Sequence, residues 1–333
     1  MRDVAVRAGV SIKTVSRVVN GEPGVAAITA ARVADAVTAL GFQRNDLARS
    51  LRQGGSSATL GLVIEDVANP FYSAIAQAVE AVARRRGYMV ITGSCEEDPD
   101  RERDLVSALL RRRVDALLLV PAAAQPEHDW LMRELRDGTP VVFLDRPPRG
   151  LDADTVVLDN RGGARRAVEH LVRYGHRRIA FLSDAPWMVT AAERLDGYRS
   201  ALAEAGVPLD EELVRVGSHD AAQAESAVRE LLALPPGRRP TAIFAGNNRH
   251  TIGAVRALRG LEREIALVGF DDFELADLLA VPTTVVRHDA QHMGEHAARL
   301  AFARLDGDRG GPRHIVVETE LVERGSGEVA PLP

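Results

Sequence analysis

Two patterns of apolar and polar positions divide the chain near residue 54. Up to that point apolar side chains recur at helical spacing, which predicts short helices at residues 3–8, 11–19 and 28–40. Beyond it, short apolar runs alternate with longer amphipathic segments. A glycine and serine tract at 54–57, typical of a flexible linker, separates the two patterns. The sequence therefore predicts a small helical domain followed by a larger domain of strands and helices.

The alternation in the larger domain predicts parallel sheets. Nine apolar runs are candidate strands: 60–65, 88–92, 116–120, 141–144, 155–158, 178–182, 213–217, 242–245 and 265–270. Amphipathic segments between them are candidate helices: 71–87, 102–113, 161–174, 191–205, 221–234 and 249–259. Apolar strands separated by helices are typical of parallel sheets that are covered on both faces. Nine strands exceed one ordinary sheet, so we expect two doubly wound α/β subdomains.

The first two predicted helices have the spacing of a helix-turn-helix. Gly9 permits the turn between them, and Ser11 is placed to cap the second helix. Six side chains in the second helix or directly after it stay exposed in this arrangement: Ile12, Lys13, Thr14, Ser16, Arg17 and Asn20. Lys13 and Arg17 can donate to guanine, and Ile12 can contact a thymine methyl group. The alternative on spacing alone is a generic helical domain whose polar side chains are only solvated.

The charge distribution favours a polyanionic partner for the helical domain. The 333-residue chain has a net charge of -5, but residues 1–54 hold eight basic and four acidic side chains and the remainder is strongly acidic. A small basic domain on an acidic body indicates a polyanionic partner for the basic part alone. Cys95 is the single cysteine, which excludes an intrachain disulfide and a cysteine-rich metal site.

Several motifs in order along the chain carry a family resemblance. The run DVAVRAGVSIKTVSRVVNG resembles the N-terminal signature of the lactose/galactose repressor (LacI/GalR) family of bacterial transcription regulators, and LGFQRNDLARSLRQG resembles that family's hinge region. VANPF, GHRRI, ERLDGY, GFDD and ELVERGS extend the resemblance over essentially the whole chain. The resemblance implies a homodimer that binds a near-palindromic operator in double-stranded DNA and answers to a small effector.

The resemblance also assigns roles to the DNA-binding side chains. It implies that Ile12, Lys13 and Arg17 contact base edges, and that Thr14, Ser16 and Asn20 approach the DNA backbone. It implies a hinge helix at 45–52 whose Leu47, Ala48 and Leu51 meet the minor groove. Leucine side chains from two chains can wedge into a base step and bend DNA. The chain departs from the family at Arg44, where proline is common.

The body resembles the type I periplasmic sugar-binding proteins, whose two subdomains close around a ligand. Ligands of open α/β sheets lie beyond the carboxyl ends of the strands. Ten side chains near such ends are the expected effector contacts: Phe71, Tyr72, Asp145, Arg146, Met188, Thr190, Arg194, His219, Asn248 and Asp271. Arg194 and Asp271 match effector-binding positions of the family, whereas Phe71 is as well explained as a core residue. Aromatic faces combined with Asp, Asn and Arg suit a sugar or sugar derivative.

Enzymatic and metal-binding interpretations have little support. The sequence contains no GxGxxG after the first strand, no GxxxxGK[ST], no GxSxG and no HExxH, so we expect neither catalysis nor a cofactor. His288, His292 and His296 recur every four residues and resemble a metal clasp on one helical face, but an ordinary exposed helix explains them better. A sugar-modifying enzyme is therefore a distant alternative.

These observations predict a sequence-specific transcription regulator, most simply a repressor of a carbohydrate-use operon. The expected domains are a helix-turn-helix head at 1–44, a hinge helix and linker at 45–57, and an effector-binding and dimerisation body at 58–333. Within the body, the first subdomain is expected at 58–160 plus 290–321, and the second at 161–289. No apolar run is long enough for a membrane span and no secretion signal is evident, which predicts a cytoplasmic protein. The alternative is a cytoplasmic solute-binding or sensory protein that does not bind DNA.

Overall fold

The computed structural model describes residues 1–42, 56–122, 128–135, 138–261 and 265–331. It divides the chain into two compact units, Met1–Ser57 and Ala58–Pro333. The predicted hinge helix at 45–52, with Leu47, Ala48 and Leu51, lies outside the described residues.

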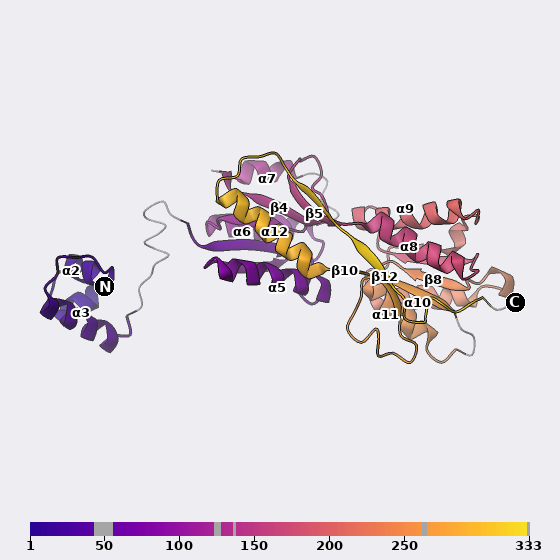
Figure 1. Cartoon of the computed structure of the whole chain (residues 1–333), viewed down its shortest axis with the longest axis horizontal. Coiled ribbons are helices and arrows are strands. Elements are labelled where there is room, and N and C mark those ends of the chain that lie inside the picture. The colour runs from indigo at the N-terminus through magenta and orange to yellow at the C-terminus, as the bar shows by residue number, and fades with distance from the viewer. Residues whose placement is uncertain (43–55, 123–127, 136–137, 262–264, 332–333) are drawn as a thin grey trace. The chain divides into compact units, whose positions relative to one another are not determined.

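The N-terminal unit contains three short helices (Figure 1): α1 (Arg2–Ala8), α2 (Ile12–Val19) and α3 (Ala27–Ala39). Their apolar faces form one small core: Val4, Ala5, Ala8, Val15, Val33 and Ala36. Gly9 adopts a left-handed conformation (φ 62°), which lets the chain turn sharply between α1 and α2. The Ser11 hydroxyl accepts a hydrogen bond from the Thr14 amide at 3.1 Å, which confirms the predicted cap of α2.

The first sheet of the body is parallel throughout and has the strand order β11-β5-β4-β3-β1-β2. Its strands are β1 (Thr59–Ile64), β2 (Met89–Ser94), β3 (Ala116–Leu119), β4 (Val141–Asp145), β5 (Asp154–Leu158) and β11 (His314–Val317). Helices α5 (Pro70–Arg85) and α12 (Ala290–Leu305) cover one face. Helices α6 (Pro99–Arg111) and α7 (Asp129–Glu134) cover the other.

The second sheet has the order β12-β10-β9-β8-β6-β7, and β12 is its one antiparallel strand. Its strands are β6 (Ile179–Ser183), β7 (Val214–Val216), β8 (Ala242–Ala245), β9 (Ala266–Phe270), β10 (Thr284–His288) and β12 (Thr319–Val322). Helices α8 (Asn160–Arg173) and α9 (Val189–Glu204) pack together on one face. Helices α10 (Ala221–Ala233) and α11 (Asn248–Leu258) pack together on the other.

All nine predicted strands are present as β1 to β9, and the two doubly wound subdomains are confirmed. The chain passes between the subdomains after β5, after β10 and after β11 (Figure 1). Strand β12 pairs with β10 in the second sheet, so residues 319–322 belong with the second subdomain. Only Glu318 separates β11 from β12, so the third crossing is a nearly continuous extended strand. None of the helices in the described part of the chain is long and apolar enough to cross a membrane.

Candidate ligand cleft and nucleic-acid interface

A cavity of about 420 Å³ lies in the body at the carboxyl ends of strands from both sheets. All ten predicted effector contacts line it. The parallel strands bring their carboxyl ends to one edge of each sheet, which explains why residues so far apart in the sequence meet here. Six further charged side chains also border the cavity and were not predicted as contacts: Glu65, Asp66, Glu96, Glu97, Asp184 and Arg249. Asp184 follows β6 directly and had the same strand-end signal as the predicted residues.

The side of the cavity formed by the first subdomain is organised around a buried guanidinium. Arg146 donates to Glu97 at 2.6 Å and to the Pro121 carbonyl at 3.0 Å, and lies 3.4 Å from Glu65. The Tyr72 hydroxyl donates to Asp145 at 3.1 Å. Burial raises the pKa of Glu65 to about 7, although the positive charge of Arg146 opposes this shift.

The side formed by the second subdomain is organised around Arg194. Its Nε donates to Asn160 Oδ1 at 2.9 Å and its Nη1 to the Gly246 carbonyl at 2.5 Å, while the guanidinium lies 3.9 Å from the centre of the Phe270 ring. Asp271 Oδ1 lies 4.0 Å from Arg194. Burial alone would raise the pKa of Asp271, but the Arg194 charge and a hydrogen bond from His288 hold it below its ordinary value.

Asp145 and Asp271 have equivalent positions in the two subdomains. Each stands at the carboxyl end of a central strand, and each has a left-handed backbone, with φ of 63° and 66°. Such backbone conformations are uncommon for residues other than glycine and concentrate at functional sites. The strained turns direct both carboxylates to the edge of the cavity.

Direct contacts join the two subdomains across the cavity. Asn248, in the first turn of α11, donates to Asn69 at 3.1 Å. Asn69 caps α5 by accepting from the Phe71 amide. Beside them, Arg249 donates to Asp66 at 2.5 Å and lies 3.5 Å from Glu65. The N-terminal turns of α5 and α11 are thus tied to each other through side chains.

Aromatic and apolar side chains supply the remaining surface. The Phe71 ring packs against the Tyr72 and His288 rings, with centroids 4.8 and 5.1 Å away, so it serves both the core and the cavity wall. Trp187 is 56% exposed, which leaves its ring available to a ligand. Met188 is buried beside it.

The predicted DNA-contacting side chains lie on one short helix or next to it. Ile12 and Lys13 are exposed at the start of α2, and Thr14 and Ser16 are half-buried. Arg17 is half-buried, and its Nη2 donates to the Pro23 carbonyl at 2.8 Å. Asn20, the residue that follows α2, donates to Ser16 at 3.2 Å.

The histidine repeat does not form a metal clasp on one helical face. His288 ends β10 and lies before α12, whereas the His292 and His296 rings stack on α12 at 4.4 Å. The break arises at Asp289, which caps α12 by accepting from the His292 amide. The spacing of four residues therefore spans two different elements.

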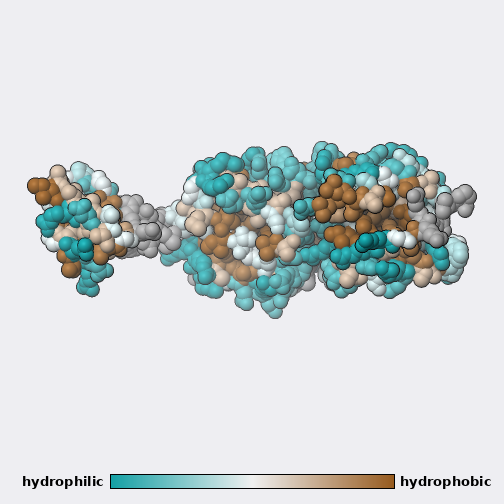
Figure 2. All heavy atoms as spheres, turned by 90° about the horizontal axis from the view of Figure 1, so that it is seen from below, coloured by the Kyte–Doolittle hydropathy of each residue, from teal (hydrophilic) through white to brown (hydrophobic). Residues whose placement is uncertain are grey.

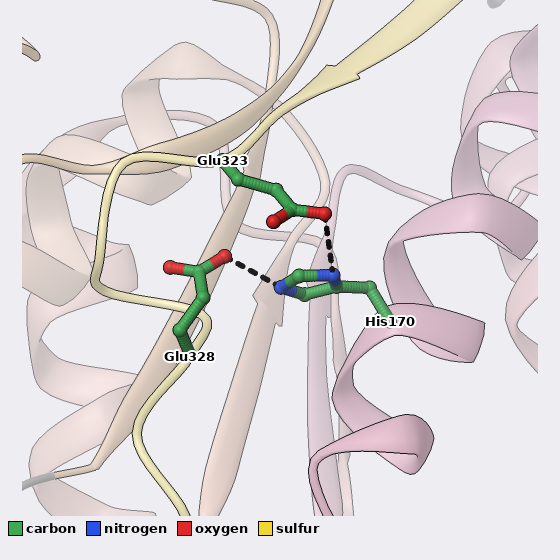
Figure 3. A group of neighbouring side chains, drawn as sticks. All are labelled: His170, Glu323 and Glu328. Carbon is green, nitrogen blue, oxygen red and sulfur yellow. Dashed lines mark hydrogen bonds and ion pairs between the residues drawn. The ribbon is translucent and has the colours of Figure 1, made fainter.

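Another histidine lies between two carboxylates (Figure 3). His170 Nε2 is 2.6 Å from Glu328, and its Nδ1 is 3.6 Å from Glu323 on the opposite side of the ring. Glu328 also accepts from the Thr284 hydroxyl and the Gly325 amide. Because the two carboxylates face opposite nitrogens, the group is suited to fastening the C-terminal segment to α8 rather than to enclosing one ion.

Comparisons with known proteins agree with this architecture. Residues 1–45 match the bacterial regulatory proteins of the lacI family, and residues 57–324 match the periplasmic binding proteins and sugar binding domain of the LacI family. The HTH-type transcriptional regulator GalR of Escherichia coli is 36% identical over 312 residues, which cover 92% of this chain and 89% of GalR. The ribose operon repressor of Escherichia coli is 32% identical over 98% of this chain and 99% of the repressor.

Solved structures show the same fold. The lac repressor dimer bound to operator and the anti-inducer ONPF has a TM-score of 0.81 and 27% identity, covering 98% of both chains. The complex of the transcriptional regulator CelR with cellobiose has a TM-score of 0.72 and 34% identity, covering 97% of this chain and 98% of CelR. Proteins of this kind are regulators and not enzymes. The chain belongs to the LacI family of DNA-binding transcriptional regulators.

Proposed function

We propose that this regulator represses a carbohydrate-use operon and that a small sugar or sugar derivative binds in the cavity to control it. The observation that carries the proposal is the convergence of Asp145, Arg194, Asn248 and Asp271 with aromatic side chains at one cavity. Sugar hydroxyls need paired donors and acceptors, which these groups provide, and pyranose faces stack on aromatic rings such as Trp187. The ribose operon repressor and the cellobiose complex of CelR support a sugar as the class of effector.

The DNA contacts are proposed by residue from the family resemblance. Ile12, Lys13 and Arg17 would contact base edges in the major groove, and Thr14, Ser16 and Asn20 would contact the backbone. In the hinge, which lies outside the described residues, Leu47, Ala48 and Leu51 would contact the minor groove. Backbone contacts fix the orientation of the head, and base contacts select the operator.

A homodimer would place two heads on a near-palindromic operator. Apolar side chains are exposed on both subdomains, including Met89 on the edge strand β2 and Leu278 in the loop after β9, which are 72% and 74% exposed. Figure 2 shows apolar surface gathered on one face of both subdomains. Exposed apolar patches and unpaired strand edges are typical of protein interfaces. We propose that a second copy of the chain covers part of this surface.

The three crossings between the subdomains suggest how an effector acts. A ligand that contacts both sides of the cavity would favour one relative orientation of the subdomains. The dimer would transmit that change to its hinges and so alter operator affinity. Effector and operator must then influence each other's binding equally, because the coupling is reciprocal.

The proposal is tested with the full-length dimer and a DNA fragment that contains its own promoter region. A salt-sensitive, sequence-selective gel shift that one sugar weakens is the expected result. Arg194→Ala and Asp271→Ala are expected to keep the shift and lose the sugar response. Asp104→Ala and Arg256→Ala, which change exposed residues outside the cavity, serve as matched controls.

Two outcomes would reject the proposal in different ways. Failure to shift any promoter DNA with or without sugars would favour a solute-binding protein that does not bind DNA. A normal sugar response in both cavity variants would place the effector elsewhere. Turnover of a bound sugar by the protein would instead support the enzymatic alternative.

A further inference from the structure

The cationic side chains at the cavity are already engaged with protein acceptors. Arg146 is buried among Glu97, Glu65 and Asp145, with nitrogen to oxygen distances of 2.6 to 3.4 Å. Arg194 donates to Asn160 and to the Gly246 carbonyl and lies against the Phe270 ring. An anionic ligand therefore finds no uncommitted guanidinium on either of these two walls.

Arg249 is the remaining guanidinium of the lining, and it is held between two carboxylates. Its side chain is 31% exposed, more than those of Arg146 and Arg194, so it is the arginine that a ligand could reach most easily. It donates to Asp66 at 2.5 Å and lies 3.5 Å from Glu65. An anion that approached Arg249 would have to compete with both of these carboxylates.

The charged side chains of the whole lining sum to a net negative charge. Seven carboxylates border the cavity, against three guanidiniums. Charges in a partly buried cavity interact more strongly than they would in water, because less solvent screens them. A phosphate or carboxylate on a ligand would therefore meet net repulsion from the charged side chains of the lining.

We propose that the cavity selects uncharged or amino sugars and rejects phosphorylated and acidic ones, with the Glu65–Arg249–Asp66 cluster as the group that enforces the selection. This inference rests on the proposed function, because it specifies the sugar that the same cavity takes. A neutral sugar keeps the ion pairs intact and exchanges only hydroxyl hydrogen bonds with the lining. An ammonium group on the sugar gains from the excess of carboxylates.

The test uses the full-length chain and matched series of ligands. Glucose, galactose and ribose are each compared with their terminal phosphates, the two hexoses also with their uronic acids and 2-amino derivatives. Thermal unfolding and calorimetry measure affinity. The parent sugar that binds is expected to do so at least about tenfold more tightly than its phosphate or uronic acid. The amino derivative is expected to bind no more weakly than the parent.

The double variant Glu65→Gln, Asp66→Asn tests the role of the cluster. At pH 8, above the pKa of about 7 of Glu65, it removes two negative charges and frees Arg249, so the discrimination against the phosphate is expected to fall at least about threefold. The double variant Asp104→Asn, Glu230→Gln makes the same change of charge at exposed positions outside the cavity and is expected to keep the discrimination. Thermal unfolding without ligand checks that both variants fold.

Each outcome decides for or against the inference. Tight binding of a phosphorylated or acidic sugar by the natural chain overturns it and leaves the proposed sugar effector in place. Unchanged discrimination in the Glu65→Gln, Asp66→Asn variant overturns the role of the cluster. A chain that binds no sugar of any charge overturns both this inference and the proposed function.

Discussion

His288 Nε2 lies 2.8 Å from Asp271 Oδ1, within hydrogen-bonding distance. Asp271 lines the cavity in the second subdomain, and His288 is the last residue of β10, where the chain crosses back to the first. The His288 ring also packs edge-on against Phe71 of the first subdomain at 5.1 Å. One imidazole therefore connects a cavity carboxylate, a cavity aromatic ring and a crossing between the subdomains.

Replacing His288 should weaken the effector response. His288→Ala removes the hydrogen bond that orients Asp271 and the edge contact with Phe71, so effector affinity is expected to fall about tenfold, since a lost hydrogen bond to a charged group costs about 1.5–3 kcal/mol. His288→Gln keeps a hydrogen-bond donor but loses the ring. Its effector affinity should lie between those of the natural chain and of His288→Ala. Calorimetry measures effector affinity, and a gel shift without effector measures operator binding separately. Unchanged effector affinity in His288→Ala would show that Asp271 needs no support.

Arg17 is expected to determine operator recognition. Arg17→Ala should cost about 1–3 kcal/mol of binding free energy on the specific operator and less on random DNA, because a base contact is lost. Arg7→Ala removes the same charge from the exposed side of α1 and is the matched control. Fluorescence anisotropy with both DNAs measures the difference. Equal losses by Arg17→Ala on the two DNAs would mean that Arg17 contacts only phosphates.

Many cavity side chains could be predicted because ligands of open α/β sheets lie beyond the carboxyl ends of the strands. Asp145 and Asp271 directly follow or end apolar strands, so their position at the shared edge follows from the parallel topology. Arg249 and Glu97 gave no such signal, because each stands among other polar residues in a helix start or a loop. Only the folded contacts show that these two side chains face the cavity and not the solvent.

The two edge strands that were missed have a different cause. Strands β11 and β12 are four residues each and lie at sheet edges, and neither contains an apolar run longer than three residues. Their pairing partners are about 160 and 34 residues away in the sequence, since β11 pairs with β5 and β12 with β10. Local periodicity carries no information about such pairing.

Close helix packing in the second subdomain depends on a glycine. A Cβ atom at Gly197 of α9 would overlap the backbone carbonyl oxygen of Arg161 in α8. Gly197→Ala is therefore expected to reduce the free energy of unfolding by about 1–3 kcal/mol, because a backbone oxygen cannot move aside as a flexible side chain can. Gly237→Ala is the control, since nothing lies within 4 Å of its added Cβ atom. Urea denaturation compares the two variants, and equal stability would show that α8 and α9 can separate at little cost.

The raised pKa of Glu65 predicts a pH dependence of stability. Burial raises this pKa from 4.5 to about 7, so the folded state binds a proton that the unfolded state releases between these values. The resulting stability is fully present below about pH 4.5 and is lost as the pH rises through about 7. Glu65→Gln imitates the protonated side chain and cannot ionise, so the variant should lack this part of the pH dependence.

Urea denaturation of the natural chain and of Glu65→Gln at pH 5.5 and pH 8 measures the effect. The stability advantage of Glu65→Gln over the natural chain is expected to be larger at pH 8 than at pH 5.5 by roughly 1–2 kcal/mol, because the natural chain loses the rest of this stability between the two pH values. Glu230→Gln, an exposed change of the same kind, should show no such difference. If Glu65→Gln were instead less stable than the natural chain at pH 8, the ion pairs of Glu65 with Arg146 and Arg249 would outweigh its burial. The pair of Glu65 with Arg249, which joins the two subdomains, would then be strongest in the ionised state.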